Sequence, residues 1–199
     1  MIQQQPKRFL RWVLTPLAGA FLILIFAAGS WALALRMTGN IHVVEPGVLY
    51  RSAQLSGDEL AEVLAKYHIR SVINLRGRNR GDAWYENELR ITAAHDALHF
   101  DVGMGATSEP RPKLIGRLLS ILRTAPRPML IHCYGGADRS GLAAALFERI
   151  VEGKSAQFAA RQLSFWYGHF SWFGSGTAAM DAAYWRLSAM EAQKGALHK

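Results

Sequence analysis

The chain is organised around residues 131–141, which read Ile131-His132-Cys133-Tyr134-Gly135-Gly136-Ala137-Asp138-Arg139-Ser140-Gly141. This stretch contains the only cysteine of the 199 residues. An apolar run that predicts a strand, Met129 to His132, leads into the cysteine, and a run that predicts a helix, Gly141 to Glu152, follows the arginine. A strand, a glycine-containing turn and a helix in this order predict an anion-binding loop at the helix N-terminus.

Several features of the stretch suit a phosphate group. A loop that enters a helix directs backbone N–H groups at one point and adds the positive end of the helix dipole. Gly135 and Gly136 allow the backbone to adopt positive φ and to form a nest of N–H groups. The same field favours the thiolate form of Cys133. The planar guanidinium of Arg139 can hold two phosphate oxygens.

The stretch resembles the signature loop of the cysteine-dependent protein tyrosine and dual-specificity phosphatases, His-Cys-(five residues)-Arg-Ser/Thr. The resemblance implies that Cys133 attacks phosphorus and forms a cysteinyl-phosphate, that Arg139 holds the equatorial oxygens, and that the Ser140 hydroxyl helps the thiolate to leave. The positions that match the signature are His132, Cys133, Gly136, Arg139, Ser140 and Gly141, and those expected to bind substrate are Tyr134, Gly135, Gly136 and Ala137.

Three other interpretations of the stretch remain open. Cys133 could be a buried structural cysteine before a glycine turn, as lone cysteines often are. The loop could belong to a sulfurtransferase, although such loops usually have one residue fewer before the arginine. It could also belong to a pseudo-phosphatase that binds phosphate without turnover, although the nucleophile and the arginine are both present.

The segments before the signature loop alternate between strand-like and helix-like patterns. This alternation predicts an α/β fold with a mainly parallel central sheet flanked by helices. Ser56 and Glu59 have the spacing of a capping box at the start of the first of these helices. The expected strands are Val48–Arg51, Ile69–Leu75, Leu98–Val102 and Met129–His132, and the expected helices are Gly57–Lys66, Trp84–Ala97, Lys113–Thr124 and Met180–Gln193.

Two short phrases extend the resemblance over roughly residues 46–190. Tyr50-Arg51-Ser52-Ala53-Gln54 and Val72-Ile73-Asn74-Leu75-Arg76 are similar to atypical dual-specificity phosphatases of bacteria, fungi and plants. Arg76 opens a basic loop that also contains Arg78 and Arg80. Because the loop follows a parallel strand, where such sheets bind ligands, Arg76 is a candidate substrate-binding residue. A solvated loop is the alternative.

The N-terminal segment predicts a membrane anchor. Residues 12–35 carry no charge. A helix over this stretch is long enough to cross a hydrocarbon core of about 30 Å. Pro16 lies near the start of this apolar stretch, where a helix tolerates proline best. The basic flank before it indicates a cytoplasmic N-terminus, so the domain would lie on the periplasmic side of a bacterial inner membrane. A cleaved signal peptide and a buried core helix are the alternatives.

The expected organisation is therefore an anchor over residues 1–40, a catalytic domain over 41–194 and a tail over 195–199. The net charge of +8 and the pI of about 10 favour an acidic partner, such as a phosphorylated substrate or anionic lipid. No nucleic-acid motif is visible. The histidines show no metal-ligand spacing, and the expected chemistry needs neither a metal nor a cofactor.

The general acid is ambiguous. In the resembled family it is often an aspartate on a loop before the helix that precedes the signature strand, which here makes Asp101 a candidate, with Glu109 as the other carboxyl. Asp138 is a third candidate, because the loop resembles that of some bacterial phosphatases with broad specificity, which carry an aspartate just before the signature arginine. A purely structural ion pair or hydrogen bond inside the loop is the alternative for Asp138, and a bound water is the remaining candidate for the acid. An anion in the loop would favour the protonated form of Asp138.

The aromatic residues between Gln162 and Phe173 are expected to pack a core between helices, with a pocket wall or a lipid-contacting surface as alternatives. The expected function is hydrolysis of phosphate monoesters at the membrane, on a lipid phosphate such as phosphatidylglycerophosphate. The alternative substrates are phosphoproteins, and a membrane-tethered phosphate-binding adaptor is the non-enzyme alternative.

Overall fold

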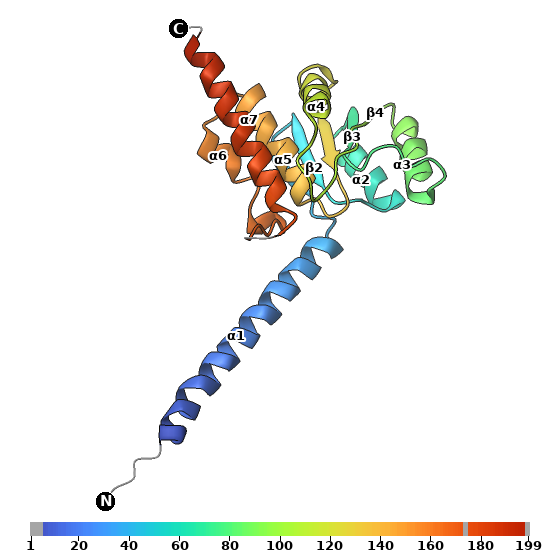
Figure 1. Cartoon of the computed structure of the whole chain (residues 1–199). Coiled ribbons are helices and arrows are strands. Elements are labelled where there is room, and N and C mark those ends of the chain that lie inside the picture. Colours follow the sequence, from blue (N-terminus) through green and yellow to red (C-terminus); the bar gives the residue numbers. More distant parts are fainter. Residues whose placement is uncertain (1–5, 173–174, 198–199) are drawn as a thin grey trace, which may run out of the picture. The chain divides into compact units, whose positions relative to one another are not determined.

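The computed structural model describes residues 6–172 and 175–197, which fall into two units. The first ends at Met37 and the second begins at Thr38. The first unit is a single helix, α1 (Pro6–Met37), and its segment Pro16–Met37 is long and apolar enough to cross a membrane (Figure 1). Because α1 begins at Pro6, Pro16 lies inside the helix rather than at its start.

The second unit is built on a five-stranded sheet (Figure 1). The strand order is β1-β2-β5-β3-β4, and only the edge strand β1 runs antiparallel to its neighbour. The predicted α/β fold with a mainly parallel sheet is therefore confirmed. The strands are β1 (His42–Glu45), β2 (Leu49–Ser52), β3 (Ser71–Asn74), β4 (Leu98–Asp101) and β5 (Met129–His132).

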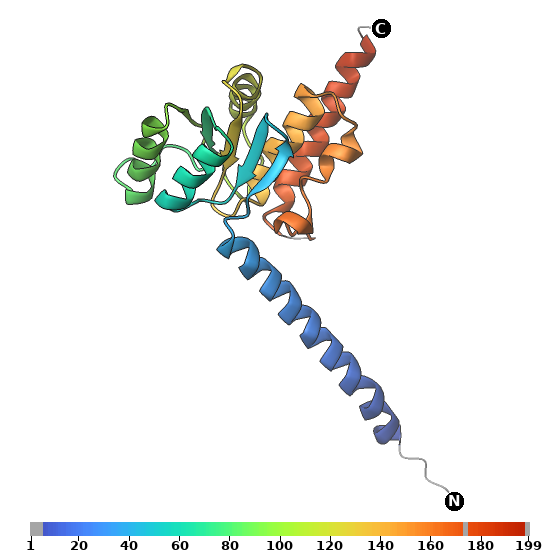
Figure 2. The same cartoon turned by 180° about the vertical axis from the view of Figure 1, so that it is seen from behind.

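Helices cover both faces of the sheet (Figure 2). Val72 and Leu130 pack with α2 and α3, whereas Ile73 and Ile131 belong to the larger core beneath α4, α5 and α7. This alternation follows from the two-residue period of side chains along a strand. The helices are α2 (Gly57–Lys66), α3 (Ala83–Ala94), α4 (Pro112–Thr124), α5 (Asp138–Leu146), η1 (Phe147–Val151), α6 (Ala156–Ala160), η2 (Phe165–Tyr167) and α7 (Ala178–Leu197).

Most expected elements are present, with two differences that matter for the site and the tail. The capping box of Ser56 and Glu59 forms at the start of α2. The helix after the signature loop begins at Asp138, three residues before the expected Gly141, so it draws Asp138 and Arg139 into its first turn. At the other end of the chain, α7 continues to Leu197, so residues 195–197 are helical.

The expectation that the aromatic segment packs a core is wrong. The side chains of Phe165, Trp166 and Trp172 are 42%, 69% and 65% exposed. The segment between α6 and α7 has too few buried positions to cover its rings, because only Gln162 and His169 are buried among its described residues. Phe165, Trp166 and Trp172 are therefore on the surface, whereas Tyr167 and Phe170 are half-buried and Phe173 lies outside the described residues.

Candidate active site

The signature loop lies at the carboxyl end of β5, in the middle of the sheet. Residues Ser52 of β2, His132 of β5 and Asn74 of β3 are paired in register at this edge. Cys133 follows His132 directly and is 2% exposed. Because parallel sheets bind ligands at the carboxyl ends of their strands, the loop occupies the expected place for a site.

Four successive carbonyl groups of the loop point outward, and each accepts a hydrogen bond from a protein donor. The Tyr134 carbonyl accepts from the Gln54 N–H at 3.2 Å, and the Gly135 carbonyl from Asn40 Nδ2 at 2.9 Å. The carbonyls of Gly136 and Ala137 accept from Arg51 Nη2 at 2.7 and 2.9 Å.

This outward arrangement of the carbonyls fixes the direction of the N–H groups. In a trans peptide, the N–H of the next residue points opposite to the C=O. The N–H groups of Gly135, Gly136, Ala137 and Asp138 therefore point to the inside of the loop. Four converging N–H groups at the N-terminus of α5 make a nest for an anion.

Gly136 is the position in the loop that only glycine can fill. Its φ is +69°, in the left-handed region. A Cβ there would lie 2.6 Å from the N atom of Ala53 and 2.7 Å from the carbonyl carbon of Ser52, both of them backbone atoms. Gly135 has open space around the same position.

The buried side chain of Arg51 holds the signature loop and the segment after α6 together. It is fully buried, and its Nη1 donates to the carbonyl oxygen and to Oε1 of Gln162 at 2.7 and 2.9 Å. Its guanidinium also stacks over the ring of Tyr167, 4.3 Å from the centroid. Burial lowers the pKa of Arg51 to about 10, so the side chain still carries its charge at neutral pH.

The other signature residues lie around the same loop. Arg139 donates from Nη1 to the Met104 carbonyl at 3.3 Å, while its buried Nε has no partner among the described residues. The buried hydroxyl of Ser140 donates to the Ser52 carbonyl at 3.4 Å. A buried guanidinium N–H without a partner, next to a nest of N–H groups, fits an anion held by both.

Asp138 is held by a histidine that the sequence did not single out. His169 Nδ1 lies 2.7 Å from Asp138 Oδ1, and His169 Nε2 lies 2.8 Å from Asp181 Oδ2 on α7. Burial favours the neutral ring, but the hydrogen bonds and charges of the two carboxylates outweigh it and raise the pKa of His169. Both ring nitrogens face carboxylate oxygens, and only the imidazolium can donate to both, so the site favours that form.

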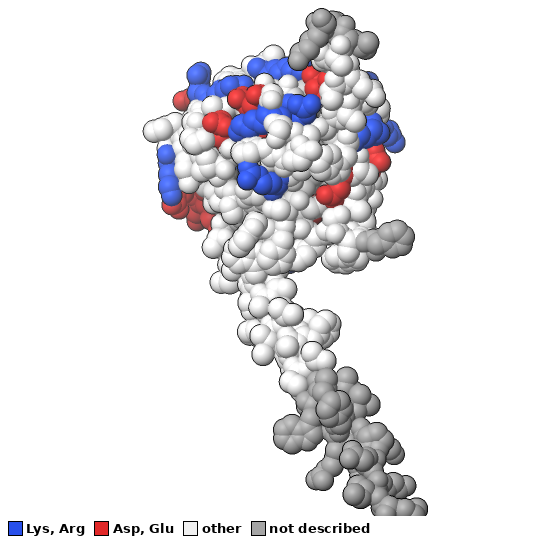
Figure 3. Space-filling view, turned by 90° about the vertical axis from the view of Figure 1, so that its left-hand side faces the viewer, with Lys and Arg blue, Asp and Glu red and all other residues white. Residues whose placement is uncertain are grey.

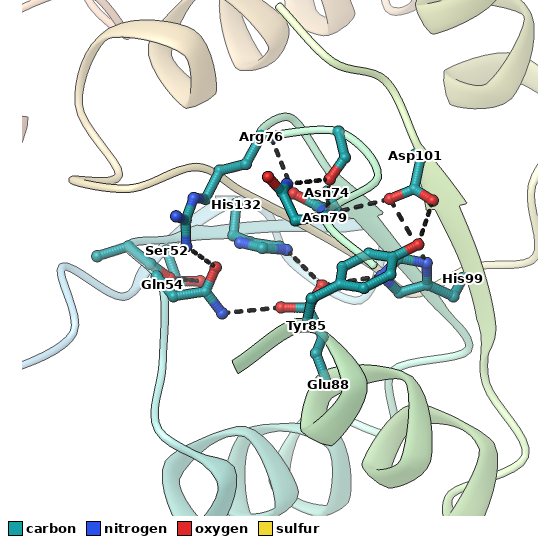
Figure 4. Close-up of polar contacts among 12 residues, drawn as sticks. Ser52, Gln54, Asn74, Arg76, Asn79, Tyr85, Glu88, His99, Asp101 and His132 are labelled. Atoms are coloured by element: carbon teal, nitrogen blue, oxygen red, sulfur yellow. Dashed lines mark hydrogen bonds and ion pairs between the residues drawn. The ribbon is translucent and has the colours of Figure 1, made fainter. Parts of the chain in front are cut away.

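The Asp101 side chain lies on the face of the sheet opposite to that of Cys133. It is in register with Asn74, and Asn74 with His132, so the three side chains share the face covered by α2 and α3 (Figure 4). Its carboxylate accepts from the Tyr85 hydroxyl at 2.6 Å and from Asn74 Nδ2 at 3.0 Å. The structure thus separates Asp101 from Cys133, which belongs to the core of the opposite face.

Glu109, the remaining candidate acid, is paired elsewhere. Its carboxylate accepts from Arg186 on α7 at 2.9 Å, and both side chains are 44% exposed. Among the described part of the chain, no three His, Cys, Asp or Glu residues group as metal ligands.

A buried polar network on the α3 side positions His132, the residue before the nucleophile. Glu88 Oε1 lies 3.1 Å from His132 Nε2 and 2.8 Å from His99 Nε2, while its Oε2 accepts from Gln54 Nε2 at 2.8 Å (Figure 4). Burial alone would raise the pKa of Glu88, but these hydrogen bonds and the charge of His132 lower it far below its ordinary value.

Four positioning residues were not predicted as such: Asn40, Arg51, Glu88 and His169. Arg51 lies in the phrase Tyr50-Arg51-Ser52-Ala53-Gln54, which indicates only a family resemblance, and His169 lies in an aromatic segment. Each acts across a separation of 31 to 95 residues, on Asp138, Gly135, Gly136 or His132. Sequence spacing carries no signal for such contacts.

Comparison with known proteins agrees with this geometry. A model of the tyrosine phosphatase family matches residues 106–160, which include the signature loop. No curated protein matches the chain. Among solved structures, TpbA from P. aeruginosa has 21% identity and a TM-score of 0.54, over 77% of this chain and 91% of TpbA.

Two further structures share the fold. The core catalytic domain of the PP-IP phosphatase SIW14 from S. cerevisiae has 17% identity and a TM-score of 0.57, over 78% of this chain and 93% of that domain. PTPMT1 has 14% identity and a TM-score of 0.57, over 77% of this chain and 99% of that protein.

Proposed function

We propose that this chain, a cysteine-dependent phosphatase of the tyrosine and dual-specificity superfamily, hydrolyses phosphate monoesters of lipids at a membrane through a cysteinyl-phosphate on Cys133. The observation that carries the proposal is the set of four loop carbonyls held outward by Gln54, Asn40 and Arg51. That arrangement presents four N–H groups to one anion beside the nucleophile.

In the first step the Cys133 thiolate attacks phosphorus, so that an S–P bond forms and the P–O bond to the leaving alcohol breaks. The loop N–H groups and Arg139 bind the three non-bridging oxygens, where they stabilise the charge of the transition state without reorganising. A proton passes to the leaving oxygen, and the alcohol departs neutral.

We assign that proton to Asp138. Asp138 is the first residue of α5 and belongs to the loop itself, whereas Asp101 faces α3 and Glu109 is paired with Arg186. The resting carboxylate of Asp138 accepts the proton of a singly protonated phosphate ester as that ester enters the loop, and Asp138 then passes this proton to the leaving oxygen. After the transfer, the imidazolium of His169 stabilises the carboxylate that remains.

In the second step a water molecule attacks the phosphorus of the cysteinyl-phosphate. Asp138, now a carboxylate, accepts its proton, the S–P bond breaks, and the thiolate returns to the loop with inorganic phosphate beside it. We assign to the Ser140 hydroxyl, which donates to the Ser52 carbonyl in this structure, the role of donating to the departing sulfur.

Three features support a lipid substrate at a membrane. The segment Pro16–Met37 can span a bilayer. Only Thr38 and Gly39 separate Met37 from Asn40 in the sequence. The Asn40 side chain donates from Nδ2 to the Gly135 and Tyr167 carbonyls, each at 2.9 Å. The aromatic segment that contains Tyr167 exposes Trp166 and Trp172, residues that favour membrane interfaces.

The charge distribution agrees with this proposal. No Lys, Arg, Asp or Glu occurs between Arg161 and Asp181. Figure 3 shows that charged side chains gather in the upper part of one face of the second unit, while its lower part is largely uncharged. With the basic N-terminal flank in the cytoplasm, the catalytic unit would lie on the periplasmic side of a bacterial inner membrane.

A phosphoprotein is the second candidate substrate. TpbA was solved with phosphotyrosine, and SIW14 is described as a PP-IP phosphatase, so the shared fold accepts different phosphate compounds. The full chain in proteoliposomes should hydrolyse phosphatidylglycerophosphate with a higher kcat/KM than a phosphotyrosyl peptide. A preference for the peptide would overturn the lipid assignment while leaving the phosphatase chemistry intact.

Two further tests address the acid and the membrane surface. Asp138→Asn should remove the decline in kcat with rising pH for an alkyl phosphate, whereas Asp101→Asn should retain it; the opposite result would reassign the acid.

Replacing Trp166 and Trp172 together by Gln should lower turnover of the vesicle-bound lipid but not of an aryl phosphate in solution. Trp185→Gln, on α7 and 46% exposed, is the matched control.

A further inference from the structure

We propose that Arg76 forms a second anion-binding subsite beside the signature loop, which selects phosphate monoesters that carry another phosphate-type negative group. The inference deepens the proposed function and rests on it. Arg76 lies two residues beyond β3, whose neighbour β5 leads into the signature loop. The Leu75 N–H donates to the His132 carbonyl at 2.9 Å, so the two loops leave the sheet side by side.

The guanidinium of Arg76 is held in place by neutral groups. It stacks on the indole of Trp84, 3.7 Å from the centroid, and lies 5.4 Å from the ring centroid of Tyr134 in the signature loop. Its Nη1 donates to Gln54 Oε1 at 3.1 Å, and Gln54 in turn bonds Glu88 (Figure 4). Stacking fixes the plane of the guanidinium and leaves N–H groups at its edge for a ligand.

The charge of Arg76 is not neutralised by a direct partner. Among the residues that the structure describes, no carboxylate forms an ion pair with it. Burial lowers its pKa, and the nearby positive charge of Arg139 lowers it further. Glu88 and Asp82 offset part of this effect from a distance. Two guanidinium groups held near each other favour a ligand with two negative groups.

The other arginines of the same loop are arranged differently. Arg78 is 65% exposed and faces Asp101 at 3.8 Å, and Arg80 is exposed. Arg80 therefore provides a control that removes the same charge from the same loop.

The chemistry of the subsite points to a substrate in which a short linker separates the scissile phosphate from a phosphodiester. A fork of guanidinium N–H groups binds the two oxygens of such a diester well. Phosphatidylglycerophosphate has this pattern, and so does its deacylated form, glycerophosphoglycerol phosphate, which needs no membrane. Glycerol 3-phosphate has the same scissile group without the second anion.

The experiment compares kcat/KM for these two soluble esters, using the full chain in detergent micelles. The wild-type protein should prefer the doubly anionic ester, and Arg76→Gln should reduce that preference about tenfold or more, as loss of a charged hydrogen bond of about 1.5–3 kcal/mol implies. Arg76→Lys should give an intermediate ratio, because it keeps the charge but not the fork. Arg80→Gln should leave the ratio unchanged.

Three outcomes would overturn the subsite. One is equal kcat/KM for both esters in the wild type, and another is an equal loss on both esters in Arg76→Gln. The third is a preference for a phosphotyrosyl peptide flanked by acidic residues that depends on Arg76, which would assign the subsite to peptide recognition instead. Turnover of neither ester by the wild-type protein would instead refute the phosphatase activity on which the subsite depends.

Discussion

His169 Nδ1 lies 2.7 Å from Asp138 Oδ1, which ties the segment before α7 to the first residue of the helix after the nucleophile. The pKa of His169 is raised above its ordinary value of 6.5. The stability that the pair contributes is therefore fully present below about pH 6.5 and is lost as pH rises through the raised pKa.

We expect His169→Gln to abolish this loss of stability on the alkaline side. The thermal midpoint of the full chain in detergent, measured from pH 5.5 to 9, should fall with rising pH in the wild type and change less in the variant. His95→Gln, at an exposed position, is the control and should follow the wild type. An identical pH slope in His169→Gln and wild type would contradict the proposed imidazolium.

Glu88 is expected to have the opposite pH dependence. Its pKa is lowered from 4.5, so its contribution to stability is present above that pH and is lost as pH falls through the lowered value. Glu88→Gln should lose about 1.5–3 kcal/mol of stability at neutral pH, because hydrogen bonds to a charged group are replaced. Unfolding in urea at pH 3 to 7 measures both effects, and exposed Glu62→Gln should behave as the wild type.

Gly136 and Gly135 provide a matched pair. Gly136→Ala places a Cβ against the backbone of Ser52 and Ala53 at positive φ, with a strain of about 1–3 kcal/mol. A loss of that size lowers the thermal midpoint by several degrees in a chain of this length. Gly135→Ala meets open space and should leave the midpoint nearly unchanged. Equal midpoints for the two variants would show that the loop has another conformation.

Arg51 should be indispensable for the shape of the loop. Arg51→Met leaves the carbonyls of Gly136 and Gln162 without their donor, at a cost of about 1–3 kcal/mol for each buried group, whereas the Ala137 carbonyl keeps the Gly141 N–H. Arg51→Lys keeps the charge, so it should fold but lose kcat, because one ammonium cannot reach all four acceptors. Arg123→Met, at an exposed position, is the control. Wild-type kcat in Arg51→Lys would contradict this role.

The sequence predicted the strand and helix bounds around the site better than the contacts between distant segments. β5 was placed at its observed bounds, and α2 with its capping box likewise, because apolar alternation and capping are local signals. Local signals do not give the register between strands. Asp101 therefore looked like an acid near the loop, although its pairing with Asn74 turns it to the face of His132.

The aromatic segment is a second case in which local sequence signals do not predict long-range contacts. Density of aromatic residues predicts burial on average, yet Trp166 and Trp172 are exposed here. What the segment contributes to the site is a histidine and two carbonyls, those of Tyr167 and Gln162. These contacts depend on the return of the chain from α6 to α7, which no short motif encodes.

The covalent intermediate is the most direct test of the central claim. The full chain is mixed with a substrate labelled in its phosphate, quenched with acid within the first turnovers and digested for mass spectrometry. We expect a phosphate on the peptide that contains Cys133. This phosphate should be absent in Cys133→Ser, which should also have no measurable turnover. Continued product formation by the wild type with no label on that peptide would contradict it.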